Sequence, residues 1–195
     1  MAEVGSHPGS WNSFQFSGLS TFNEIAAAAT MPADGDISSI SCFVGGDGGS
    51  VTARFCIWRS SDGVLLAQTG SFTLASGSRS SGGQSWVTQS LGTPLHVANG
   101  TGLYIGWWRD PAGGAVWSLL TPGSFSKKTD TSGSPGTFSS PTSDASGQLG
   151  AYATYTATVR KLKVAGADPT AVKVNGTPVT AVKVSSGGVW VTVWP

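Results

Sequence analysis

The stretch Val51-Thr-Ala-Arg-Phe-Cys-Ile-Trp-Arg59 decides the fold class. Every second residue from Val51 to Ile57 is apolar, and the residues between them are mostly polar. This period of two is typical of a strand with one buried face. The apolar stretch 25–31 matches at most one helical turn before Pro32, and no segment keeps a helical period for three turns. The sequence therefore predicts an all-β protein.

Short strands separated by turn sequences extend this pattern in both directions. We expect them at residues 37–44, 64–68, 72–74, 86–89, 95–98, 103–108 and 152–159. The Gly-rich turn 45–49 should join 37–44 to 51–59 as partner strands. Strands of this length and spacing are typical of a β-sandwich or barrel. Residues 121–148, almost all Ser, Thr, Gly, Pro and Asp, are expected to form a long loop.

The composition excludes several classes of protein. Of 195 residues, 28 are Gly, 29 Ser and 20 Thr, yet eight Trp and an aromatic content of 10% suffice for a packed core. The net charge of +1 gives no global attraction to nucleic acid or to a membrane surface. No apolar run is long enough to span a bilayer, and the first residues lack the features of a secretory signal.

The two cysteines are not expected to form a disulfide. Cys42 is in phase with apolar Ile40, whereas Cys56 is in phase with Thr52 and Arg54, so the two thiols belong to opposite kinds of face. We expect reduced, partly buried thiols. With only two histidines besides, the chain lacks the ligands for a zinc site.

The last 34 residues contain a ten-residue repeat, at 162–171, 172–181 and 182–191. Each copy starts with an apolar residue, Lys and Val, and Asn175-Gly176 is a favoured hairpin turn. Hairpins this small are marginally stable alone, so we expect them to attach the chain to a partner or to mediate oligomerisation. The candidate interface residues are apolar side chains of the repeat: Val172, Val174, Val182, Val184, Trp190 and Trp194.

Charge is distributed unevenly between the two parts of the chain. Residues 159–195 carry a net charge of +4 and the preceding 158 residues a net charge of −3. Isolated lysines at alternating strand positions are more typical of a solvated face that prevents edge aggregation than of a nucleic-acid site. We therefore expect no nucleic-acid partner.

Two stretches carry a resemblance to known families. The repeat, over residues 160–195, resembles the C-terminal tails of minor tail proteins from phages of actinobacteria. Residues 23–158 resemble phage virion β-sandwich modules of the carbohydrate-binding type, in the stretches Ile37-Ser-Ser-Ile-Ser, Val51-Thr-Ala-Arg-Phe-Cys-Ile-Trp, Gly63-Val-Leu-Leu, Trp86-Val and Leu103-Tyr-Ile-Gly-Trp-Trp-Arg-Asp. The resemblance implies a jelly-roll-like fold and a place in the virion, and it transfers no sugar-binding residue.

The expected organisation has three parts. Residues 1–22 form an aromatic Gly/Ser arm, residues 23–158 a jelly-roll-like β-sandwich with the long loop 121–148, and residues 159–195 the small β-hairpin repeat. No catalytic residues are expected. The chain lacks a Gly-x-Ser-x-Gly nucleophile turn and a phosphate-binding loop, and Asp34, Asp36 and Asp47 fall in turns where Asp is common anyway. The spacing of a calcium loop is also missing, so we expect no metal and no cofactor.

One aromatic group is a candidate glycan site. Trp107, Trp108, Arg109, Asp110 and Trp117 flank the turn that follows Asp110. Adjacent residues of a strand point to opposite faces, so one of the paired tryptophans should point outward and could stack on a sugar while the charged pair binds hydroxyls. In the alternative, Trp107 or Trp108 packs beneath the 121–148 loop or against a neighbouring subunit.

These expectations converge on a non-enzymatic phage virion protein, a minor tail protein first of all. Its expected partners are other virion proteins, further copies of itself in a homo-oligomer such as a trimer, and a host-surface glycan. It would be assembled in the host cytoplasm without membrane insertion. A capsid decoration or head-fibre protein, and a free carbohydrate-binding module, remain as alternatives.

Overall fold

The computed structural model describes two compact units, Met1–Ala157 and Thr158–Pro195. The described residues are 1–6, 22–47, 51–74, 76–77, 85–111, 115–118, 120–121, 123–129, 133–144, 148–158, 173–174, 177–178, 182–186 and 189–194. Most of the expected arm, residues 7–21, therefore lies outside the described part of the chain.

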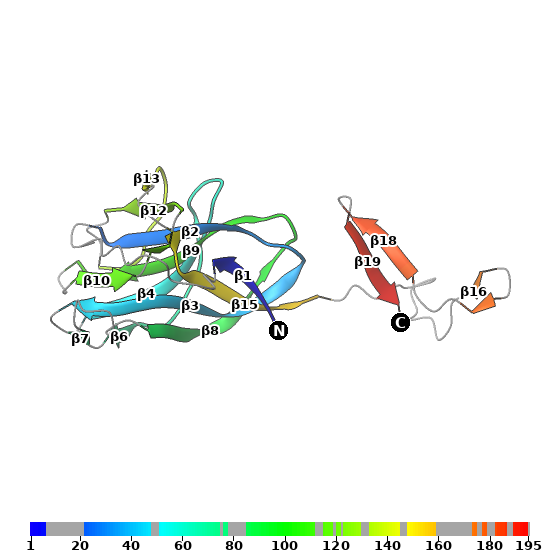
Figure 1. Ribbon diagram of the computed structural model, residues 1–195, viewed down its shortest axis with the longest axis horizontal. Coiled ribbons are helices and arrows are strands. Elements are labelled where there is room, and N and C mark those ends of the chain that lie inside the picture. Colours follow the sequence, from blue (N-terminus) through cyan, green and yellow to red (C-terminus); the bar gives the residue numbers. More distant parts are fainter. Residues whose placement is uncertain are drawn as a thin grey trace. The chain divides into compact units, whose positions relative to one another are not determined.

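A six-stranded sheet forms one layer of the first unit (Figure 1). Its main path runs β1 (Ala2–Ser6), β15 (Ala151–Ala157), β3 (Gly35–Asp47) and β10 (Ala115–Ser118). Strands β8 (Ser85–Val97) and β7 (Ser76–Gly77) also pair with β3. All of these pairings are antiparallel except the short one between β7 and β3.

A seven-stranded antiparallel sheet forms the other layer. Its order is β13 (Thr142–Asp144), β12 (Phe125–Lys128), β2 (Glu24–Thr30), β9 (Gly102–Arg109), β4 (Val51–Arg59) and β5 (Leu65–Gln68), with β6 (Phe72–Leu74) also paired to β4. A separate two-stranded sheet joins β11 (Leu120–Thr121) to β14 (Gln148–Leu149).

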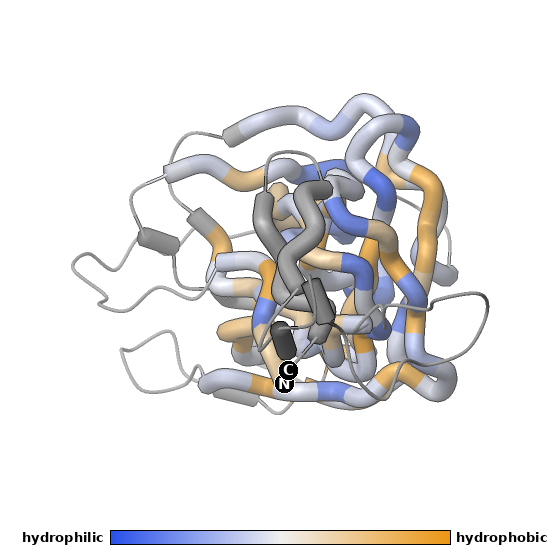
Figure 2. The backbone as a smooth tube through the Cα atoms, turned by 90° about the vertical axis from the view of Figure 1, so that its right-hand side faces the viewer, coloured by the Kyte–Doolittle hydropathy of each residue, from blue (hydrophilic) through white to orange (hydrophobic). Residues whose placement is uncertain are grey.

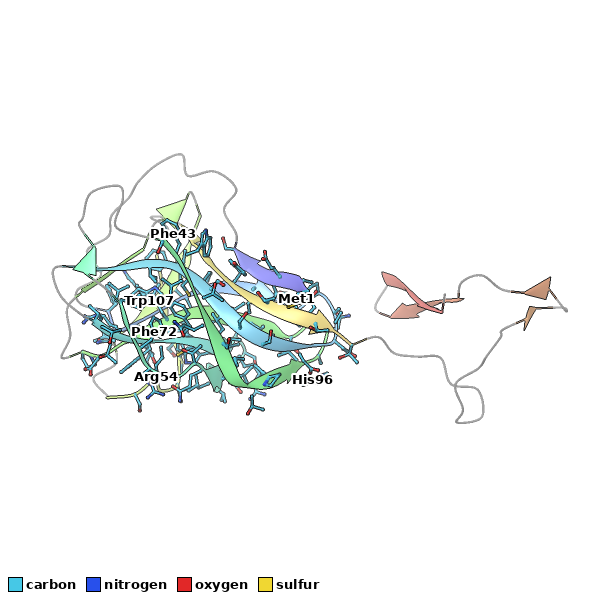
Figure 3. The ribbon with its side chains drawn as sticks, turned by 90° about the horizontal axis from the view of Figure 1, so that it is seen from below. Met1, Phe43, Arg54, Phe72, His96 and Trp107 are labelled. Atoms are coloured by element: carbon cyan, nitrogen blue, oxygen red, sulfur yellow. The ribbon has the colours of Figure 1, made fainter. Side chains whose placement is uncertain are left out.

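The core lies between the inner faces of the two sheets. Ile37 and Ile40 of β3 belong to the same buried cluster as Phe55 of β4 and Trp107 of β9, all without solvent exposure. In Figure 3, Trp107 lies between Phe43 and Arg54, which belong to opposite layers. The tube in Figure 2 shows hydrophobic and hydrophilic positions following one another along the backbone of the first unit. The predicted all-β, sandwich-like fold is confirmed, and none of the described residues forms a helix that could cross a membrane.

Several expected connections were wrong. Strands 37–44 and 51–59 are not partners: β3 and β4 lie in different sheets, and their apolar faces meet across the core. Residues 24–30 form strand β2 between β9 and β12, because pairing on both sides outweighs the helix propensity of alanine. The expected strands 86–89 and 95–98 are one strand, β8, whose register with β3 shifts beside Pro94. A bulge accommodates a proline because it needs no ladder hydrogen bond there.

The expected long loop, 121–148, contains much more structure than a loop. It contributes β12 and β13 to the seven-stranded sheet and β14 to a small separate sheet. Phe125, Phe138 and Leu149 in or beside it are buried. Apolar residues spaced this widely among Ser and Gly do not produce a periodic pattern, so the sequence conceals these elements.

The second unit contains two hairpins in its described residues. In the first, β16 (Lys173–Val174) pairs with β17 (Thr177–Pro178), and Val174 lies opposite Thr177 as expected for a turn at residues 175–176. In the second, β18 (Val182–Ser186) pairs with β19 (Val189–Trp194). The predicted hairpins of the second and third copies are thus present, and the first copy, residues 162–171, lies outside the described part of the chain.

Candidate functional site

Trp107 and Trp108 near the end of β9 point to opposite faces of the seven-stranded sheet. Trp107 is paired with Ile25 and Phe55 and belongs to the core between the sheets. Trp108 belongs to a second buried cluster, which is separate from that core. The two tryptophans are only 0% and 2% exposed, so neither ring offers an open face for a sugar.

The second cluster lies on the outer face of the seven-stranded sheet, and we call it the outer aromatic cluster. Its buried members are Ala26, Cys56, Trp58, Trp108 and Phe138, and the partly buried Leu65 and Tyr104 pack against them. Phe138 stacks on Trp58 with ring centroids 4.9 Å apart and planes at 28°. It also meets Tyr104 edge-on at 5.3 Å. An aromatic side chain from outside the sheet therefore fills the space above these strands.

Residues 133–141, which we call the strap, carry Phe138 across this face. Phe138 N donates to Gly63 O at 2.7 Å. Trp58 Nε1 donates to Gly136 O at 3.0 Å, and Gly136 N donates to Glu24 Oε1 at 3.1 Å. The strap is thus attached to three strands or turns of the sheet by both its backbone and its one aromatic anchor.

A buried carboxylate lies at one end of the strap. Glu24 is fully buried, is paired with Trp108 across β2 and β9, and has its Oε2 3.8 Å from Lys128 Nζ. The Lys128 ammonium also donates to Thr137 O of the strap. Burial raises the pKa of the neighbouring Cys56 thiol well above its usual value, and the charge of Glu24 raises it further. Such a site keeps the thiol protonated.

Arg109 and Asp110 do not form an open sugar-binding pair. Arg109 is 4% exposed, and its Nε donates to Phe22 O at 3.2 Å. Desolvation lowers the pKa of its guanidinium, an effect that the charge of Asp110 opposes. Asp110 is fixed by its own backbone, whose N–H donates to Thr52 O at 2.9 Å. Both residues therefore secure the end of β9.

The five glycan candidates do not converge on one place. Trp117 belongs to β10 of the six-stranded sheet, where it lies opposite Gly45 of β3. Its side chain is outside the described part of the structure. Trp107 is in the core, and Trp108 is on the outer face of the other sheet. The alternative in which a tryptophan packs beneath residues 121–148 describes the arrangement of Trp108, because Phe138 of the strap belongs to the same cluster.

Sequence reasoning missed a second aromatic group, on the outer face of the six-stranded sheet. Trp86 of β8 contacts Phe43 of β3 edge-on at 5.6 Å and Tyr152 of β15 at 5.0 Å. Ser41 and Thr88 exchange a hydroxyl hydrogen bond of 2.8 Å between the same strands. The signal that could have revealed it is the phase of Phe43, which is opposite to that of the core residues Cys42 and Val44.

The remaining polar candidates have structural roles. Asp34 Oδ1 accepts a hydrogen bond from Asn99 N at 2.8 Å, and Asp36 Oδ1 is paired with His96 Nδ1 at 2.8 Å on the surface. Over the described ranges, no three His, Cys, Asp or Glu side chains are grouped as a metal site requires.

Cys42 and Cys56 are free, as expected from their opposite faces, but both are fully buried and not partly so. Cys42 lies in the core between the sheets and Cys56 in the outer aromatic cluster.

The candidate assembly residues lie on strands of the second unit. Val174 is in β16, Val182 and Val184 are in β18, and Trp190 and Trp194 are in β19. Val172 and the side chains of all six fall outside the described part of the structure. Comparison of the chain with models of protein families, with curated proteins and with solved structures found no match.

Proposed function

We propose that this chain is a non-enzymatic structural protein of a phage virion, and that a minor tail protein is the description that fits it best. The observation that carries the proposal is the C-terminal repeat. Three ten-residue copies with the pattern apolar-Lys-Val lie in a compact unit of their own, residues 158–195, whose described residues form two antiparallel hairpins.

The physical role proposed for these hairpins is attachment. Each is a two-stranded sheet, so each strand has an edge that lacks a partner within its own sheet. Such hairpins are marginally stable alone and gain stability when another chain covers their apolar face or extends their ladder. Valines and the tryptophans at 190 and 194 would supply the apolar area for contacts with other virion proteins or with copies of the same chain.

The first unit is proposed to be the displayed part. Its two-sheet architecture supports a jelly-roll-like interpretation, and its low content of charge suits close packing in a repeated assembly. Contact with a host-surface glycan belongs to the same proposal. The group of Phe43, Trp86 and Tyr152 then replaces buried Trp107 and Trp108 as the aromatic surface to examine for such contact.

The test is the composition of the phage particle. Purified particles of the encoding phage are analysed by mass spectrometry, and an antibody against residues 23–158 is located on them by immunogold electron microscopy. Labelling at the tail supports a minor tail protein, and labelling over the head favours a decoration protein or head fibre. Absence from the particle contradicts the proposal and leaves the free carbohydrate-binding module.

A further inference from the structure

Phe138 is the aromatic anchor of the strap on the outer face of the seven-stranded sheet. Phe138 has no solvent exposure, whereas its neighbours Thr137, Ser139 and Ser140 are exposed. None of residues 133–141 belongs to a strand. Besides Phe138, Pro135 is the other buried residue among the described residues 133–141, so few side chains attach this segment to the sheet.

The strands of the seven-stranded sheet beneath the strap are held by continuous ladders of backbone hydrogen bonds. Strand β4 is paired along its length with β9 on one side and with β5 and β6 on the other. The strap instead makes isolated hydrogen bonds to Gly63, Trp58, Glu24 and Lys128. Segments with few backbone hydrogen bonds and little buried area open at lower free energy than paired strands do.

Within the outer aromatic cluster, the closed arrangement leaves the indole N–H of Trp108 without a hydrogen bond. Trp108 Nε1 is buried, and the described residues provide no hydrogen-bond acceptor for it. A buried donor without an acceptor is destabilising, and water would satisfy it if the covering segment moved away. The unsatisfied Trp108 N–H therefore makes closing of the strap less favourable.

From these contacts we propose that the strap opens and closes on the first unit while both sheets remain paired, and that it controls access to the outer aromatic cluster. Opening removes Phe138 from Trp58 and Tyr104 and uncovers their rings together with Trp108. It also uncovers the Cys56 thiol, which belongs to the same cluster.

The two cysteines provide a test within the chain itself. Cys56 belongs to the same buried cluster as Phe138 of the strap, whereas Cys42 lies between the sheets and becomes accessible only when the sheets separate. The native full-length protein is incubated with iodoacetamide, and alkylation of each cysteine is followed by peptide mass spectrometry. Cys56 should be alkylated at least about tenfold faster than Cys42, because strap opening needs less free energy than separation of the sheets.

The variant Phe138→Ala tests whether the strap controls access to Cys56. Loss of the anchor should accelerate alkylation of Cys56 by about 100-fold and leave Cys42 within about threefold of its original rate. Ser139→Ala is the matched control, since this neighbour is exposed, and it should change neither rate. Equal alkylation rates of the two cysteines in the native chain, or equal acceleration of both by Phe138→Ala, would overturn the proposal.

Amide hydrogen exchange gives a second measurement that needs no variant. The Gly136 and Phe138 amides are both hydrogen-bonded in the closed strap. Ile57 and Ile105 are opposite each other in the β4–β9 ladder and report on the sheet. The two strap amides should share one exchange free energy that lies below that of the two ladder amides. A common value for all four amides contradicts separate opening, even if the Phe138→Ala variant does not fold.

Discussion

Phe138 and Gly63 fit together only because residue 63 has no side chain. Phe138 N donates to Gly63 O at 2.7 Å, and a Cβ added to Gly63 would lie 2.4 Å from the Phe138 carbonyl carbon. Gly63 also has a φ of +71°, which favours glycine on its own account. The turn between β4 and β5 is therefore shaped to receive the strap.

Gly63→Ala should destabilise the first unit. The left-handed φ costs an L-residue roughly 1–2 kcal/mol, and the clash with the strap backbone adds about 1–3 kcal/mol because backbone atoms must shift. The expected result is a lower midpoint in urea unfolding followed by tryptophan fluorescence.

Two other glycines separate these contributions. Gly100 has a φ of +78° with no atom within 4 Å of an added Cβ, so Gly100→Ala measures the backbone cost alone. At Gly70 an added Cβ also meets nothing within 4 Å, and the φ of Gly70 lies outside the left-handed region, so Gly70→Ala should have little effect. If Gly63→Ala costs no more than Gly100→Ala, the close fit between the turn and the strap contributes nothing.

The ion pairs Lys128–Glu24 and Arg59–Asp62 should differ in their contribution to stability. Lys128→Met removes one cation from beside the fully buried Glu24 carboxylate and should lower the free energy of unfolding by about 1–3 kcal/mol. Arg59→Met breaks the pair with Asp62, in which both side chains are more than 40% exposed, and should cost much less. Urea denaturation of both variants at the same salt concentration makes the comparison.

Glu24→Gln combined with Lys128→Met provides the control for that pair. Neutralising the carboxylate should recover part of the loss, because a neutral amide is easier to bury than an unpaired charge. A double variant that is less stable than the sum of the single effects would contradict the ion-pair account.

Asp62 should titrate below the normal range for aspartate. Hydrogen bonds from Arg59, the shortest at 2.7 Å, lower its pKa first, and the Val64 N–H lowers it further. Since the folded pKa is below the unfolded value, the pair stabilises the protein fully above the unfolded pKa and loses this effect as the pH falls through the folded pKa. Carboxyl-detected NMR should show the Asp62 pKa rising in Arg59→Met. An unchanged pKa in that variant would exclude Arg59 as the cause.

The strands with strict alternation could be predicted from sequence. Strand β4 has the expected bounds, Val51–Arg59, because one of its faces packs in the core and its apolar residues therefore recur at every second position. Its partner could not be predicted, since register and sheet membership depend on contacts between residues far apart in the sequence. The continuity of β8 past Pro94 could not be predicted either, because it depends on a bulge in the pairing of β8 with β3.

The outer aromatic cluster was beyond prediction for a different physical reason. The sequence predicts that Trp107 and Trp108 point to opposite faces of their sheet. Which of the two points into the core depends on the position of the other sheet. Phe138 stands alone among Ser, Thr, Gly and Pro, so no local pattern marks it as buried. Its partner Trp58 is 80 residues earlier in the chain, and only the fold brings the two rings together.

The proposed role of the C-terminal repeat is tested most directly by the molar mass in solution. Multi-angle light scattering is recorded on the full chain and on a chain that ends after Thr158, the first unit having been checked by circular dichroism in both. The account predicts a defined multiple of the chain mass for the full protein and the mass of a single chain for the shortened one. A full-length protein that remains a single chain at all concentrations, or an oligomer that survives removal of the repeat, would contradict oligomerisation through these hairpins.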